Sequence, residues 1–203
     1  MRFTAADGTA AHGWAQRLAT PSTTRRDLAD AVHALAMLHG SYPGMADDAL
    51  IRHAQPDADA WLAEVSAGFA AERAVLASLV AAAGPLPSTP GQAASEAAIL
   101  GQRHALDMLA RSDRSGCATG AVAALLIDWP AVRRVLDHAG RCFTIAVPPP
   151  NLPDEIDTAT TVGSLGATPA TERAIAFGAE QLLAQHRGLW TLLEARAEAR
   201  DRS

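Results

Sequence analysis

The chain has 203 residues, of which 49% are hydrophobic and 19% charged, and its formal net charge is −5. This length fits one domain that buries enough surface to fold without a disulfide or a structural metal, and the composition excludes a disordered chain. The negative charge argues against nucleic acid or an anionic membrane as a partner.

The cysteines and the chain start give an expectation for the compartment. Cys117 and Cys142 lack the spacing of metal ligands, so both are interpreted as reduced packing cysteines. Residues 1–27 contain no apolar segment of the kind that directs secretion, and the longest apolar run, Ala121 to Ile127, is too short to span a bilayer. We therefore expect a cytoplasmic protein that does not contact a membrane.

The first half of the chain predicts an arm followed by helices. Residues 1–23 show no hydrophobic periodicity and are expected to form an N-terminal arm, leaving 24–203 as one helical domain. A helix is predicted from Thr24, a good N-terminal cap, to His39, where Gly40 provides a stop. A short helix over 45–53 and a long one over 57–84 follow, and the second ends at a Gly/Pro-rich turn.

The next helix has two alternative ends. It is expected to begin at Thr89-Pro90, and residues 112–116 resemble a break. However, the apolar positions on either side of that segment stay in phase at about 100° per residue, which favours one continuous helix to Asp128. Asp128 is then expected to cap a separate helix over 130–142.

The last third predicts a long connection and a final helix. Residues 143–167 are rich in Pro and Gly and are expected to be extended, and Thr168-Pro169 opens a helix to about Arg200. No strand pattern competes with these helices. The sequence therefore predicts an all-α fold, an antiparallel helical bundle with four long helices plus shorter ones.

Three polar residues interrupt the apolar faces near the middle of long predicted helices: Glu72, Asp113 and His186. Midpoints of antiparallel neighbours meet, so these side chains are expected to converge at the waist of the bundle. Two carboxylates and an imidazole suit Fe, Mn or Zn, and they equally suit acid–base chemistry. The alternative, which we weight more heavily, is a purely structural network in which buried charges pair with each other or with nearby arginines.

Further polar residues are secondary candidates for the core: Gln102, His104, Glu172 and His39. Glu172 lies in a first helical turn and His39 in a last turn, positions where the helix dipole favours an acid and a histidine respectively. The spacing Gly116-x-x-x-Gly120 indicates close packing against a neighbouring helix, or alternatively a small-residue face toward an apolar ligand.

Long Ala-rich helices with mid-helix Glu72, Asp113 and His186 give the chain an architectural resemblance to ferritin-like bundle proteins over about residues 24–200. The resemblance implies a waist site, but those proteins carry Glu-x-x-His pairs on two helices, whereas Val75 and Leu183 occupy that offset from Glu72 and Glu180 here. A complete di-iron site is therefore not expected.

No nucleotide-binding, hydrolase or metalloprotease motif occurs in the chain, and no catalytic residue is assigned. The sequence favours a non-catalytic protein that acts through association, as a homodimer or another homo-oligomer. Leu100, His104 and Met108 form a second face that suits such a contact. The alternative is a metal- or small-ligand-binding, ferritin-like protein with a redox role and a site at the bundle waist.

Overall fold

The computed structural model describes residues 8–166 and 168–202, and these residues form helices and connecting loops without a strand. The elements in chain order are η1 (Thr9–Ala11), α2 (Gly13–Leu18), α3 (Arg25–His39), α4 (Met45–Ile51), η2 (Pro56–Ala58), α5 (Asp59–Ala83), α6 (Gln92–Ala110), α7 (Cys117–Phe143), α8 (Glu155–Leu165) and α9 (Pro169–Asp201). The predicted all-α class is confirmed.

Several helix ends follow from local sequence signals. The Thr24 hydroxyl accepts a hydrogen bond from the backbone N–H of Asp27, and Thr168 accepts one from Thr171. Gly40 follows α3, and Gly84 ends α5 with a φ of 82°. These caps satisfy backbone groups that a helix end leaves unpaired, which is why the predicted ends agree closely with the structure.

The predicted N-terminal arm over 1–23 contains two short helices in its described part. Residues 9–18 form η1 and α2, and Trp14 and Leu18 are buried in the core. Both elements contact α7 and α9. Burial of these apolar side chains holds the segment against the body, although its sequence is too short for a clear helical period. Residues 1–7 lie outside the described residues.

The prediction of one helix from 89 to 128 is also wrong. Helix α6 ends at Ala110 and α7 begins at Cys117, after Gly116 with a left-handed φ of 95°. Both helices bury an apolar face in the same core. The apolar positions of α6 and α7 can therefore agree in helical phase across the loop even though the two helices are separate. Instead, α7 continues past Asp128 and Pro130, where a break was expected.

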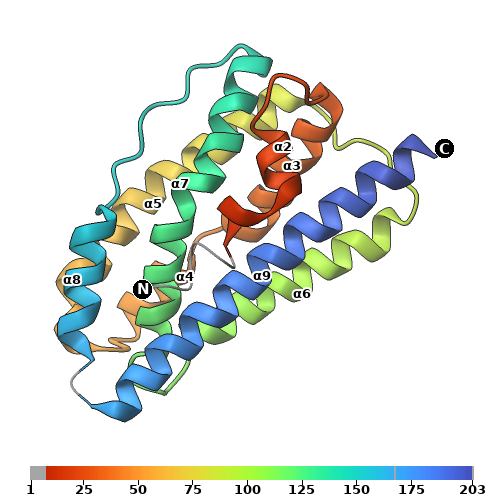
Figure 1. The fold of residues 1–203 in the computed structure, drawn as a ribbon. Helices are drawn as coiled ribbons and strands as arrows, with labels where there is room; N and C mark the ends of the chain where they lie inside the picture. The colour runs from red at the N-terminus through yellow and green to blue at the C-terminus, as the bar shows by residue number, and fades with distance from the viewer. Residues whose placement is uncertain (1–7, 167, 203) are drawn as a thin grey trace.

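The connection over 143–167 is only partly extended. After α7 the chain runs extended along the molecule and then forms α8 (Figure 1). The extended part passes over α5, where a Cβ on Gly68 would lie 2.4 Å from the carbonyl oxygen of Asn151. Asp154 caps α8 by accepting from the N–H of Asp157.

Helix α7 lies at the centre of the fold, since most of its residues are buried and it contacts each of the other α-helices. Its contact with α9 is the closest: a Cβ on Gly120 would lie 2.0 Å from the Ile175 carbonyl oxygen, and one on Gly178 would lie 2.0 Å from that of Cys117. The close-packing interpretation of Gly116 and Gly120 is therefore confirmed. In Figure 1, α6 and α9 run alongside each other on one side of α7.

Pro56–Ala83, which covers η2 and α5, is long and apolar enough by composition to cross a membrane, with a mean hydropathy of 1.4 in its most apolar window. A core helix of a soluble protein passes the same test. This helix also carries the buried Glu72 in its middle, paired with an arginine of α7. The cytoplasmic location stays a prediction.

Candidate functional site

Glu72 lies on the buried face of α5, as the helical phase predicts, and is 1% exposed. The Arg133 Nη1 donates to both of its carboxylate oxygens at 2.9 Å, and the Trp129 indole donates to Oε2 at 2.7 Å. Arg133 also donates to the Pro148 carbonyl oxygen. Glu72 is thus neutralised and fully engaged, which is the structural alternative that the sequence offered.

His186 is also buried as predicted, at 1% exposure on α9. Its Nδ1 lies 2.6 Å from Oδ2 of Asp128 on α7, and its Nε2 lies 3.0 Å from Nε2 of His39 at the end of α3. Thr9 donates to Asp128 from both its backbone N–H and its hydroxyl. These contacts make a continuous chain from Thr9 through Asp128 and His186 to His39.

The three predicted waist residues do not form one cluster. Asp113 is exposed in the loop between α6 and α7, because α6 ends before it. The carboxylate of Glu72 is held by Arg133, and both ring nitrogens of His186 are engaged elsewhere. Among the described residues, no group of three or more His, Cys, Asp or Glu side chains is arranged to hold a metal ion.

Of the secondary candidates, two are partly buried and two are exposed. Gln102 is partly buried and donates from Nε2 to the Gln185 carbonyl oxygen, which joins α6 to α9. His104 and Glu172 are exposed. His39, by contrast, is partly buried at the end of α3, where it lines a pocket together with residues of four other helices.

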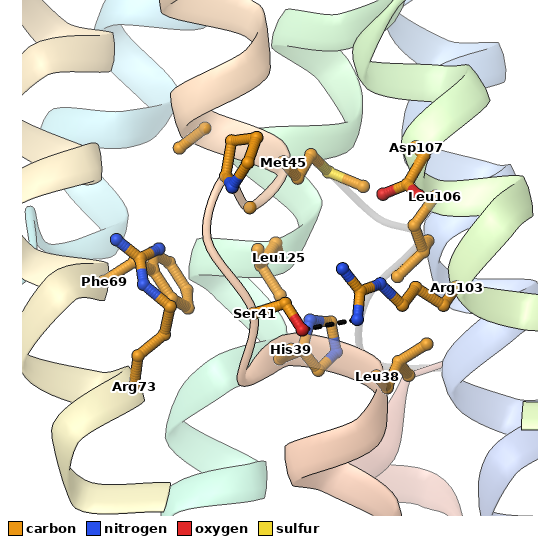
Figure 2. A pocket seen from close by; sticks show the side chains of 13 residues that line it. Leu38, His39, Ser41, Met45, Phe69, Arg73, Arg103, Leu106, Asp107 and Leu125 are labelled. Carbon is orange, nitrogen blue, oxygen red and sulfur yellow. Dashed lines mark hydrogen bonds between the residues drawn. The ribbon is translucent and has the colours of Figure 1, made fainter. Parts of the chain in front are cut away.

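A small cavity of about 30 Å³ lies where α3 ends, between α4, α5, α6 and α7. Figure 2 shows Arg103 and Asp107 on one side of it and Arg73 on the opposite side. Apolar side chains supply much of the remaining wall: Leu38, Met45, Phe69, Leu106 and Leu125. Since a buried water needs roughly 10–15 Å³, the cavity has room for about two waters, which is the size of a carboxylate group.

The two arginines at the pocket have different partners. Arg73 is neutralised by Asp47, whose Oδ2 lies 2.9 Å from Nη1 and also accepts from the backbone N–H of Gly44. Arg103 donates to the neutral hydroxyl of Ser41, drawn as the dashed line in Figure 2. Within the described part of the chain Arg103 has no ion pair. Its guanidinium therefore keeps donors and a positive charge for a further group.

Electrostatics set the protonation of the polar chain. Burial alone raises the pKa of Asp128, but the hydrogen bonds from His186 and Thr9 and the interaction with His186 bring that pKa below its ordinary value, so the carboxylate stays ionised. Burial, assisted by the neighbouring His186, lowers the pKa of His39 well below 6.5. His39 is therefore neutral at neutral pH.

Sequence reasoning missed Asp128, Arg103, Ser41 and Thr9. Asp128 could have been found, because on a continuous helix it shares a face with Ala121, Ala124 and Leu125, all of which are buried. The expected break at Pro130 turned it into a helix cap instead. Arg103 and Ser41 carry no such signal, since an arginine on a partly exposed helix and a serine in a loop are ordinary surface residues.

Comparison with curated proteins and with solved structures finds no match. A family model does match, and it covers residues 4–201, which is nearly the whole chain. The match includes every residue of the pocket and of the polar chain from Thr9 to His39. The chain belongs to the family of unknown function DUF6975.

Proposed function

We propose that this protein binds a small monocarboxylate in the pocket between His39 and Arg103. The observation that carries the proposal is the Arg103 guanidinium, which faces a cavity of carboxylate size and contacts a neutral hydroxyl there rather than an acid. A guanidinium presents paired N–H donors that match the two oxygens of a carboxylate, so such a ligand would replace the Ser41 contact with a stronger one.

The walls restrict the ligand further. The apolar side chains of Leu106 and Leu125 suit a short carbon chain, and the volume excludes a large cofactor from the enclosed part. Asp107 lines the same wall as Arg103 and disfavours anions with more than one charge, such as phosphate, by repulsion. The carboxylate would fill the enclosed part of the pocket, and the rest of a compact acid of two to four carbons would lie toward its opening.

Ligand-observed saturation-transfer NMR with acetate, lactate and pyruvate tests the proposal. We expect transfer to at least one acid, loss of transfer in Arg103→Gln, and retention in Arg134→Gln, a matched change of an exposed arginine on α7. Inorganic phosphate should not displace the acid. Absence of transfer to all three acids, or equal transfer to both variants, would overturn the proposal.

Self-association remains a second candidate function, supported by one observation. Leu100 and Met108 are 54% and 58% exposed on α6, eight residues apart and so on one helix face, with His104 between them. A second copy of the chain would cover this face. Light scattering should give a dimer mass that falls to the monomer mass in a Leu100→Glu, Met108→Glu double variant; a monomer in the unaltered protein would rule it out.

The binding proposal replaces the metal-binding alternative and does not use the ferritin-like resemblance. In a ferritin-like site Glu72 would be a ligand, but here its oxygens accept from Arg133 and Trp129. The waist of the molecule instead holds a chain of neutral and ionised hydrogen-bonding groups that ends at the pocket, and this chain suits proton chemistry better than metal ligation.

A further inference from the structure

The His39 ring has one engaged and one unengaged nitrogen. Its Nε2 points into the core, 3.0 Å from Nε2 of His186. For Nδ1, on the other side of the ring, no partner exists within the described residues. His39 lines the pocket, and because its Nε2 is engaged with His186, Nδ1 is the ring nitrogen left for a group bound there.

The ionised Asp128 carboxylate determines which ring nitrogens of His186 and His39 carry a proton. An ionised carboxylate can only accept, so Nδ1 of His186 carries the proton directed at it. In a neutral His186 the Nε2 is then an acceptor, and His39 must donate to it from Nε2–H. This arrangement leaves a lone pair on Nδ1 of His39. The core thus fixes which nitrogen of His39 is basic, as second partners of a histidine generally do.

The same chain has a second protonation state that differs by one proton. If Nδ1 of His39 takes up a proton, its Nε2 proton can pass to Nε2 of His186. The resulting imidazolium lies against the Asp128 carboxylate, at the 2.6 Å contact already present. A buried positive charge is thereby formed next to a buried negative one, which offsets its desolvation. His39 is a base in the first state and an acid in the second.

We infer that His39 is a general base that removes a proton from the carbon next to the carbonyl of a 2-oxo acid bound at Arg103. The inference rests on the proposed function, since Arg103 must hold the carboxylate. Among small carboxylates, 2-oxo acids have a C–H whose conjugate base is stabilised as an enolate, so an imidazole can act on them without a further reactant.

The step balances within the pocket. The C3–H bond breaks, its electron pair forms the C2–C3 double bond, and the carbonyl π pair moves to the oxygen as an enolate. The proton goes to Nδ1 of His39, and the Nε2 proton of His39 goes to His186. Reversal returns a proton to C3. The Ser41 hydroxyl and the remaining N–H groups of Arg103 are placed at the pocket to donate to the enolate oxygen.

Other charged groups surround His39 and belong to every helix around the pocket: Asp47 of α4, Arg73 of α5, Arg103 and Asp107 of α6, Asp128 of α7 and His186 of α9. Arg73 and Asp47 cancel each other as an ion pair. In this arrangement His39 is the catalytic residue, while Asp128 and His186 are positioning residues that act through its ring.

The test is exchange of the methyl protons of pyruvate in D₂O, followed by ¹H NMR. We expect the protein to accelerate exchange above the rate in matched buffer. His39→Gln should lower the protein-dependent exchange rate at least about tenfold. His104→Gln, a change of an exposed histidine on α6, should leave that rate unchanged. Asp128→Asn should move the midpoint of the pH–rate profile while saturation transfer to pyruvate persists.

The outcomes separate the two proposals. Pyruvate that binds in an Arg103-dependent way but exchanges no faster than in buffer overturns the inference and leaves the binding function intact. Pyruvate that does not bind, while acetate or lactate does, also overturns the inference alone, whereas absence of binding by all three acids overturns both proposals. Circular dichroism confirms that each variant is folded. If His39→Gln does not fold, Arg103→Gln provides the comparison: it lies at the partly exposed pocket wall and should lose exchange and binding together.

Discussion

Nε2 of His39 lies 3.0 Å from Nε2 of His186, and this contact joins an accessible pocket to a carboxylate in the centre of the fold. The two histidines come from helices at opposite ends of the sequence, α3 and α9. Asp128 on the central α7 contacts the other ring nitrogen of His186. The chain therefore connects the packing of the whole molecule to the protonation of one imidazole.

Asp128→Asn should destabilise the fold. The carboxylate accepts from Thr9 twice and from His186, and an amide cannot accept at both of its terminal atoms. A hydrogen bond to a buried charge contributes about 1.5–3 kcal/mol, so we expect the free energy of unfolding in urea to fall by about 3 kcal/mol. Asp113→Asn in the exposed loop should change it by less than about 0.5 kcal/mol. Equal effects of the two changes would contradict the assigned roles.

Glu72→Ala tests whether this residue is structural. Its removal leaves the buried Trp129 indole without an acceptor and leaves Arg133 with the half-exposed Asp137 carboxylate as its anionic partner, and breaking such a buried pair costs about 3–5 kcal/mol. Glu72→Met combined with Arg133→Met removes both charges and should recover most of that loss. Urea denaturation measures both. A single variant as stable as the unaltered protein would instead indicate a strained functional carboxylate.

His39 should make stability depend on pH. Because burial and His186 hold its pKa below 6.5 in the folded state, the unfolded chain binds a proton that the folded chain does not, over the range between the folded value and 6.5. The neutral ring therefore makes its full contribution to the free energy of unfolding above pH 6.5. That contribution decreases as the pH falls from 6.5 toward the pKa of His39 in the folded protein. One such group contributes up to about 1.4 kcal/mol per pH unit.

Urea unfolding at pH 5.0, 6.0 and 7.5 measures this dependence. His39→Gln should reduce the slope, whereas His104→Gln should leave it unchanged because that ring is exposed. Some slope will remain, since burial also lowers the pKa of His138 and His12. The lowered pKa of Asp128 acts below about 3.8, outside this range. An unchanged slope in His39→Gln would refute the assignment.

Gly120→Ala should separate α7 from α9. The added methyl group would lie 2.0 Å from the Ile175 carbonyl oxygen, and backbone on both sides prevents a cheap adjustment. We expect a loss of at least about 2 kcal/mol in the free energy of unfolding. Gly101→Ala on α6 meets nothing within 4 Å and should instead stabilise the protein by about 0.5–1 kcal/mol. Thermal denaturation of the two variants should therefore shift in opposite directions.

The fold was predictable where local chemistry decides it. Thr24, Gly40, Gly84 and Thr168 act as caps in the structure as their residue types suggest, and long apolar periods gave the class and the last helix. The error at Pro130 has a physical cause. Proline lacks one backbone donor, but nearly all of α7 around it is buried, and that burial keeps the helix continuous.

The site was predictable only in part. Helical phase identified Glu72 and His186 as buried, because a single polar residue on an apolar face is a local pattern. It could not assign their partners, which are 61 and 58 positions away for Arg133 and Asp128. The pocket forms where the loop after α3 meets four other helices, and no sequence periodicity predicts that arrangement.

Long-range ¹H–¹⁵N NMR of the imidazole nitrogens reads the protonation of His39 and His186 without any substitution. At pH 7.5 we expect His39 to be protonated at Nε2 and bare at Nδ1, His186 to be protonated at Nδ1, and added pyruvate to shift the Nδ1 resonance of His39. A His39 ring protonated at Nδ1 and bare at Nε2, with a spectrum that pyruvate leaves unchanged, would refute the role of His39 as a base at this pocket.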